Sequence, residues 1–304
     1  MAHAEYCTVV DVCGFLADHR MARFTSYGID RELVTDEQGR PVAPVPAIKP
    51  TTLFRGQNKT YDTLRPSIYR PHPPCATWQS EQTVRIDTDS LRMPHPYYCA
   101  DLEREFYFSC IKAADLISQA KAMFPDFPDE VNGHALCQHY GLPTHMLDFT
   151  QDVWTAGFFA SHLFTGNGFI PCEKGIGVIY DLDVEKVPPG CVYEIGIQPL
   201  PRPFAQRGFL LQVPPNVNLL YHPAIRQIYF EHSAAASAVI GERFAQGADL
   251  VPADKTSDFI EAGLRERFVT RRAIDDYVSR VPAGQRASLE TSIDRLFSGQ
   301  IEIR

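Results

Sequence analysis

The sequence predicts an α+β fold in which a mixed central β-sheet is flanked by helices and followed by a helical C-terminal segment. Short β-rich runs at 177–182, 209–213 and 226–230 are each bounded by glycine or proline, as strands commonly are. Apolar residues instead recur at helical spacing along 101–123 and over much of 232–304. Both patterns within one chain are typical of an α+β domain.

The composition is that of a globular chain. It has 304 residues, of which 44% are hydrophobic and 22% charged, enough for one large core or two small ones. No stretch approaches the length of a transmembrane helix, and the N-terminus lacks the features of a signal peptide. None of the eight cysteines forms a Cys-x-x-Cys pair, which favours reduced thiols over a metal site. We therefore expect a cytoplasmic protein without a membrane contact or a bound metal.

The net charge is -8, so no overall basic field attracts nucleic acid. A local basic groove stays open as an alternative, because Arg55, Arg65 and Arg70 lie close together in the sequence.

The first fifty residues read as a lead-in to the core. We expect a short helix over 8–24 and an irregular, proline-rich crossing over 35–50. Residues 51–56 have strand character and stop at Gly56. The segment 71–98 carries five prolines among histidines and aromatic residues, which predicts a long surface insertion.

The remaining core elements follow in order. Helical spacing covers 101–123 and 131–140, and the second of these helices is ended by Gly141 and Pro143. Residues 146–150 read as a strand, and 152–163 as a helix with Asp152 near its N-terminus. The domain prediction is therefore a lead-in at 1–50, a core at 51–231 with the insertion at 71–98, and a helical segment at 232–304 packed on the core.

Two segments carry side chains that a strand would not take into a core without a purpose. The first is Phe54-Arg55-Gly56-Gln57. Arginine suits bidentate phosphate binding, and Gly56 would let a ligand approach the backbone. The alternative is a salt bridge from Arg55 to a helix carboxylate such as Glu103 or Glu105.

The second segment is Gln138-His139-Tyr140-Gly141-Leu142-Pro143-Thr144, followed by Leu147-Asp148-Phe149-Thr150. Strand alternation places Asp148 opposite to Leu147 and Phe149, in a cleft or at the end of the following helix. His139 would line a site beside Asp148, or it is a satisfied buried histidine. Gln206 stands at the start of a strand, as a site residue or as a loop amide that bonds the backbone.

Together these segments resemble the FRG domain family, over roughly residues 50–215. The matching elements are Phe54-Arg55-Gly56-Gln57, Leu64-Arg65-Pro66-Ser67, the segment 138–150, Phe159-Ala160 and Gln206-Arg207-Gly208-Phe209. One departure is His145, where the family usually has an arginine.

The family pattern is in turn similar to that of ADP-ribosyltransferases. In those enzymes one strand carries Arg or His with Gly, a second carries a Ser-Thr-Ser-like stretch followed by a helix, and a third carries Gln/Glu-x-Glu. Phe54-Arg55-Gly56, Asp148-Phe149-Thr150 and Gln206-x-Gly208 occupy these places in order. The glutamate of the third strand is absent here.

This resemblance implies NAD as the substrate and a catalytic set of Arg55, Asp148 and Gln206. Arg55 would bind the diphosphate or a ribose, and Asp148 would supply the missing carboxylate, with Glu231 as the second candidate for that role. Gln206 would orient a ribose hydroxyl or the acceptor. Tyr140 or Phe149 would offer a stacking face. The implied NAD-binding residues are Arg55, Gly56, Gln57, His139, Tyr140, Phe149 and Thr150.

The function implied by the resemblance is transfer of ADP-ribose to RNA, DNA or protein by an intracellular bacterial toxin or antiphage effector. A neutralising antitoxin protein is the implied partner. Two alternatives remain: a non-catalytic FRG module for ligand binding or interaction, and a nuclease or hydrolase built on His139 and Asp148.

Overall fold

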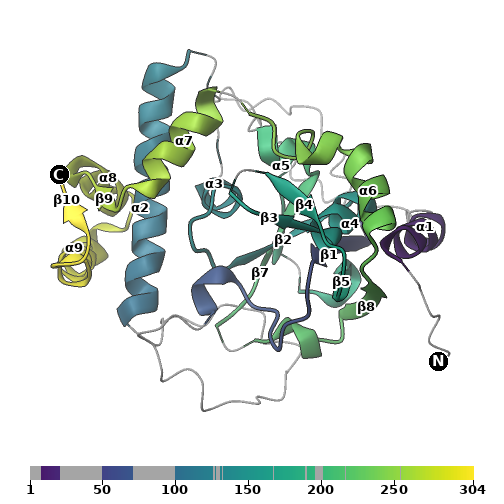
Figure 1. The fold of residues 1–304 in the computed structure, drawn as a ribbon. Helices are drawn as coiled ribbons and strands as arrows, with labels where there is room; N and C mark the ends of the chain where they lie inside the picture. Colours follow the sequence, from purple (N-terminus) through teal and green to yellow (C-terminus); the bar gives the residue numbers. More distant parts are fainter. Residues whose placement is uncertain are drawn as a thin grey trace, which may run out of the picture.

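A six-stranded antiparallel sheet forms the centre of the molecule (Figure 1). The computed structural model describes residues 8–20, 50–70 and 100–304, apart from 126, 128–130, 132, 167, 189, 196–200, 216 and 254. The strand order is β6-β7-β2-β1-β5-β8. The strands are β1 (Thr52–Gln57), β2 (Met146–Thr150), β5 (Ile176–Asp183), β6 (Val192–Glu194), β7 (Gly208–Gln212) and β8 (Ile225–Glu231).

The prediction of a mixed sheet is wrong, because every neighbouring pair in this sheet is antiparallel. The cause is the burial of both faces. Six consecutive residues of β5 are buried, and all but Asp181 are non-polar or aromatic, so the strand lacks the apolar–polar alternation that marks an antiparallel strand with one solvated face. The only parallel pair within the described residues joins β9 (Phe268–Val269) and β10 (Glu302–Ile303), outside this sheet.

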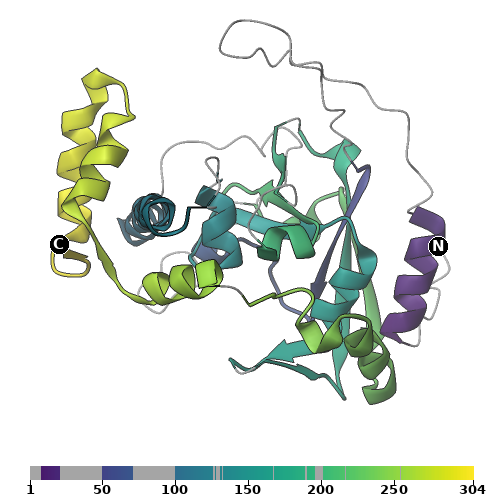
Figure 2. The same cartoon turned by 90° about the horizontal axis from the view of Figure 1, so that it is seen from above.

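One face of the sheet packs against the helices α1 (Val9–Arg20), α4 (Val153–Ser161) and α6 (Ala234–Arg243) (Figures 1 and 2). Phe54, Ile179 and Phe230 point into this layer. Leu53, Phe149 and other sheet residues fill the opposite face. There they meet apolar residues of the chain between β5 and β8, among them Val187, Val213, Val217 and Leu219.

Helix α4 lies directly on β1, and Gly56 permits this approach. A Cβ atom at Gly56 would stand 1.8 Å from the carbonyl oxygen of Ala156 and 2.7 Å from the amide nitrogen of Ala160. The absent side chain therefore accommodates the backbone of a helix, a role that the sequence analysis did not predict. Gly177 of β5 is crowded in the same way, with the Ala160 carbonyl oxygen 2.9 Å from its notional Cβ.

The N-terminus of α4 is fixed by Asp152. Its carboxylate accepts hydrogen bonds from the backbone nitrogens of Trp154 (3.3 Å) and Thr155 (3.1 Å), and from the Thr155 hydroxyl (2.7 Å). A cap of this kind stabilises a helix by about 1 kcal/mol. Asp152, and not Asp148, therefore satisfies the helix end.

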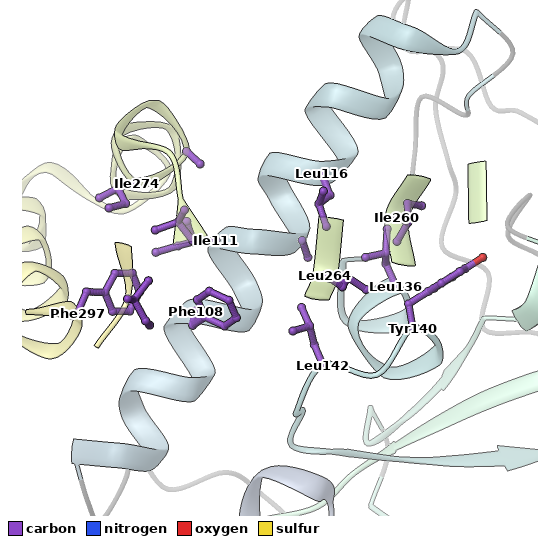
Figure 3. Packing of buried hydrophobic residues seen from close by; sticks show 14 of the residues in the cluster. Phe108, Ile111, Leu116, Leu136, Tyr140, Leu142, Ile260, Leu264, Ile274 and Phe297 are labelled. Carbon is purple, nitrogen blue, oxygen red and sulfur yellow. The ribbon is translucent and has the colours of Figure 1, made fainter. Parts of the chain in front are cut away.

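A second hydrophobic core surrounds the long helix α2 (Ala100–Met123), shown in Figure 3. Phe108, Ile111 and Leu116 project from α2 toward residues of α3 (Gly133–His139), α7 (Lys255–Arg265), α8 (Arg271–Ser279) and α9 (Ala283–Phe297). The segment 232–304 is thus divided. Its first helix, α6, packs against α1 and α4 on the sheet, whereas α7, α8 and α9 pack on α2.

The predicted helices at 101–123 and 152–163 and the strands at 51–56, 146–150, 177–182, 209–213 and 226–230 are present, with ends shifted by a few residues. The smaller elements are the hairpin β3 (His162–Phe164) and β4 (Phe169–Pro171), helix α5 (Pro201–Ala205) and the 3-10 turn at Ser67–Tyr69. The irregular crossing at 35–50, the end of the helix predicted at 8–24 and the insertion at 71–98 fall outside the described residues, with residue 50 excepted.

Within the described part of the chain, no helix combines the length and apolarity needed to cross a bilayer. Cys13, Cys110, Cys172 and Cys191 are free thiols.

We expect Gly56→Ala to destabilise the protein by about 1–3 kcal/mol or more, because the new methyl group meets backbone atoms that cannot move aside. Gly14→Ala in α1 is the matched control. Its Cβ would meet nothing within 4 Å, and alanine is favoured in a helix by about 0.5–1 kcal/mol. Urea denaturation of both variants measures the difference. Equal stability of Gly56→Ala and the parent would contradict the packing of α4 on β1.

Candidate functional site

A cavity of 760 Å³ opens beside β1 and β2. Its walls come from these two strands, from α3, α4 and α5, from the β3–β4 hairpin, and from α7. All nine residues selected from the sequence line it: Arg55, Gly56, Gln57, His139, Tyr140, Asp148, Phe149, Thr150 and Gln206.

The cavity lies where the sheet divides. Strands β1 and β2 are registered at only one position, Phe54 opposite Thr150. By contrast, β1 pairs with β5 at six positions and β2 with β7 at five. The two halves of the sheet therefore separate beyond Phe54 and Thr150, which opens space between their backbones.

Arg55 bridges this separation. Its Nη1 donates to the backbone oxygen of Asp148 at 2.9 Å and lies 3.3 Å from the carboxylate oxygen Oδ2 of the same residue. The side chain thus supplies a hydrogen bond where the strand ladder is missing. Glu105, one of the alternative partners, is instead paired with Arg267 at 2.7 Å.

Asp148 turns away from the core, as strand alternation predicts, while Leu147 and Phe149 are buried on the other face. Gln138 donates from Nε2 to Asp148 Oδ2 at 2.8 Å, and the Thr144 hydroxyl donates to Gln138 Oε1. The carboxylate is therefore oriented by an arginine and by an amide that is itself held in place.

The two motif segments are also joined through their backbones. The amide nitrogen of Thr144 donates to the hydroxyl of Ser67 at 3.1 Å, and the amide nitrogen of Ile68 donates to the Thr144 carbonyl at 3.2 Å. These bonds hold the 64–70 segment against the 138–150 segment, although no residue of 64–70 lines the cavity. His145 is 5% exposed, its ring is tilted by 52° to that of Phe106 with the centroids 5.6 Å apart, and it does not line the cavity.

His139 stands behind Asp148, with its Nε2 at 3.9 Å from Asp148 Oδ1 and its side chain 4% exposed. Burial lowers the pKa of the imidazole from its usual 6.5, and Arg202 adds to this effect. The charge of Asp148 and a hydrogen bond with Gln206 oppose it without cancelling it. The imidazole is consequently neutral at physiological pH.

Three buried polar atoms of this group have no hydrogen-bond partner among the described residues: Arg55 Nε, His139 Nε2 and Asp148 Oδ1. A buried polar group without a partner costs about 1–3 kcal/mol. Concentration of such atoms along one cavity wall is typical of a binding or catalytic site.

Thr150 and Gln206 connect β2 to the start of β7. The Thr150 hydroxyl donates to the Gln206 backbone oxygen at 2.7 Å, and Gln206 Nε2 donates to the Leu250 carbonyl at 2.9 Å. Gln206 thus combines the two predicted roles. It lines the cavity, and its amide nitrogen is bonded to the backbone.

The aromatic stacking role expected of Tyr140 or Phe149 is not supported by their burial. Phe149 is 3% exposed and belongs to the core below the sheet. Tyr140 is 7% exposed, its hydroxyl lies 2.9 Å from that of Ser257, and Arg202 already covers its ring at 4.6 Å.

Gln57 of β1 and Glu231 of β8 differ in their relation to the cavity. Gln57 Oε1 accepts a hydrogen bond from the Tyr180 hydroxyl at 2.9 Å, and burial raises the pKa of that hydroxyl to about 12. Glu231, the second candidate for a catalytic carboxylate, lies on β8 and does not line the cavity.

Sequence reasoning missed one wall of the cavity. Glu261, Leu264 and Arg265 of α7 line it, and Glu261 is paired with Arg202 of α5. No local motif surrounds these residues, so only the tertiary packing of α7 on α2 brings them to the site. Gln138, by contrast, lies within the recognised motif and had a signal in the sequence. Within the described residues, no three His, Cys, Asp or Glu side chains form a metal-binding cluster.

We expect the free energy of unfolding to fall as the pH is lowered below about 6.5, because the unfolded chain binds a proton at His139 more readily than the folded chain does. His162 and His222, whose pKa values burial also lowers, contribute in the same direction. His139→Gln should therefore lose less stability than the parent between about pH 7.5 and about pH 5.5 in urea denaturation. An unchanged pH dependence in the variant would show that His139 titrates as it does in the unfolded chain.

Comparison with known proteins gives one match. No curated protein and no solved structure matches this chain. Residues 50–163 match the family model described as the FRG domain. The matched segment contains β1, β2, α3 and α4, and with them Arg55, His139 and Asp148, but neither Gln206 nor α7. The match thus supports the FRG family for the segment of the chain that carries the Arg55–Asp148 pair.

Proposed function

We propose that this protein transfers ADP-ribose from NAD to a macromolecular acceptor. The observation that carries the proposal is the gathering of Arg55, Asp148 and Gln206 around one cavity in the divided sheet, from the neighbouring strands β1 and β2 and the residues that lead into β7. The cavity volume of 760 Å³ is in the range of small-molecule and cofactor sites, about 300–1,000 Å³.

Arg55 is suited to bind the diphosphate of NAD. A guanidinium has five N–H donors, and Nη1 alone serves the contacts with Asp148. The Arg55 side chain lines the cavity and is 15% exposed, so donors that do not contact Asp148 can meet phosphate oxygens there.

Asp148 is suited to the reaction itself. In the proposed step the bond between ribose C1′ and the nicotinamide nitrogen breaks, and nicotinamide leaves with the bonding electron pair. Positive charge then develops on the ribose, and a carboxylate beside it stabilises the transition state by about 3 kcal/mol. Asp148 Oδ2 is held by Arg55 and Gln138, and Oδ1 is buried without a partner among the described residues. The side chain as a whole is 34% exposed and lines the cavity, so the carboxylate can act on this charge.

Transfer is completed when a nucleophilic atom of the acceptor bonds to C1′ and releases its proton. Asp148, whose side chain is 34% exposed and lines the cavity, is the group placed to receive that proton. The implied biological setting, a bacterial toxin or antiphage effector with a neutralising partner, rests on the family resemblance alone and is part of the proposal.

A second candidate function is a non-catalytic module that binds a nucleotide. The observation that favours it is the pairing of both carboxylates that line the cavity, Asp148 with Arg55 and Glu261 with Arg202. A carboxylate neutralised by an arginine stabilises positive charge less than an unpaired one does.

The proposal is tested by incubating the full chain with NAD labelled in the nicotinamide or in the adenylate, alone and with a cell lysate. We expect release of nicotinamide and transfer of the adenylate label. Asp148→Asn should lower the rate about 10²- to 10³-fold, the loss seen when one electrostatic group is removed from a transition state. Arg55→Ala should raise KM for NAD.

The matched controls are Asp276→Asn and Arg272→Ala, on the exposed surface of α8 away from the cavity. They should behave as the parent does. Saturable NAD binding without nicotinamide release would favour the binding module. If Asp148→Asn consumed NAD at the parental rate, the catalytic role of this carboxylate would be refuted.

A further inference from the structure

Two aromatic rings stand exposed at the mouth of the cavity. Tyr61 follows β1 and is 46% exposed, and Phe164 of the β3–β4 hairpin is 59% exposed, yet both line the cavity. The rings of Tyr140 and Phe149, deeper in the site, are covered by protein. The flat surfaces available to a ligand are therefore at the rim and not at the floor.

Positive charges accompany the Tyr61 ring. Lys59 places its Nζ 5.0 Å from the centre of that ring. Arg70 is exposed, and its Nε donates to the Arg65 carbonyl at 3.2 Å. Partial burial and then the charge of Arg55 lower the pKa of Arg70, while Tyr61 and Asp148 oppose them, so its guanidinium lies within electrostatic reach of all three.

We define the rim cluster as Lys59, Tyr61, Arg70 and Phe164. Asp62, also exposed, lies in the same stretch, so residues 59–70 carry three basic side chains (Lys59, Arg65 and Arg70) and one carboxylate. Arg265 of α7 adds a further cation at the cavity wall. Its side chain is 82% exposed, and its Nη2 lies 4.0 Å from Glu261 Oε2, at the outer limit of an ion pair. The surface around the mouth is therefore locally basic although the chain carries a net charge of -8.

We propose that the rim cluster binds single-stranded nucleic acid and presents one of its bases to the cavity as the ADP-ribose acceptor. This inference rests on the proposed function, and it names the acceptor class. Unpaired bases would stack on Tyr61 and Phe164, while Lys59 and Arg70 hold neighbouring phosphates. A duplex keeps its bases stacked on one another, so it cannot use the exposed rings.

A protein acceptor is the less favoured alternative. The centres of protein–protein interfaces are apolar and contain few lysines. Here a lysine, Lys59, lies directly over the exposed Tyr61 ring. Aromatic rings interspersed with cations are the composition of single-strand binding grooves.

The test is fluorescence anisotropy of labelled single-stranded RNA and DNA oligonucleotides with the full chain, in the absence of NAD. We expect saturable binding that weakens with salt, and weaker binding of the same sequences as duplexes. Tyr61→Ala should lower the affinity about 5- to 150-fold, the range for loss of one base–aromatic stack, and Tyr61→Phe should retain it. Arg70→Ala should reduce the slope of log K against log salt by about 0.7.

The matched controls are Tyr221→Ala, at a tyrosine that is 71% exposed and does not line the cavity, and Arg272→Ala on α8. Both should bind the oligonucleotides as the parent does. Absence of saturable binding, equal binding of duplexes, or affinities unchanged by both Tyr61→Ala and Arg70→Ala would overturn the inference. A difference between the RNA and DNA affinities identifies the natural strand.

The two proposals can fail separately. A chain that consumes NAD and labels only protein in a lysate, without binding oligonucleotides, loses this inference and keeps the proposed function. A chain that binds oligonucleotides through Tyr61 and never consumes NAD loses the proposed function.

Discussion

The division of the sheet between β1 and β2 is the constraint on which the rest of the site depends. The strands share one registered pair, Phe54 and Thr150, and then separate. Separated strands leave backbone groups without ladder partners, and Arg55 satisfies one of them at the Asp148 carbonyl. Helix α4 secures the other side of β1 through its contact at Gly56. An arginine and a glycine next to each other in the sequence thus perform opposite tasks, one filling the gap in the sheet and one allowing a helix to close on it.

The sequence predicted most of the elements and the identity of the residues that meet at the cavity. Strand alternation was sufficient to place Asp148 away from the core, since Leu147 and Phe149 needed the apolar face. Strand direction was not predicted correctly, because a strand buried on both faces, such as β5, lacks the apolar–polar alternation that separates antiparallel from parallel sheets. The packing of α4 on Gly56 was also not predicted. A missing side chain signals close approach, but nothing in the neighbouring letters tells whether a ligand or a helix approaches.

The part of the site that sequence reasoning could not reach is the wall made by α7. Glu261 and Arg202 are separated by 59 positions and lie on different elements, and neither belongs to a motif. Their pairing depends on α7 resting on α2, which in turn depends on a hydrophobic core distinct from the one beneath the sheet. Tyr140 links these levels, because it packs in the α2 core, bonds Ser257 at the base of α7, and lies under Arg202 at the cavity.

The extent of the family match has a consequence for where this fold begins and ends. Residues 50–163 include β1 and β2, but the strands that flank them, β5 and β7, come later in the chain. An isolated segment with these borders would contain β1 and β2, which are registered at a single position, without β5 and β7, which pair with their outer edges. Helix α4 would then pack on an incomplete sheet. The matched stretch is therefore smaller than the set of strands that completes the sheet, and on its own it would leave the outer edges of β1 and β2 open to pairing with other chains.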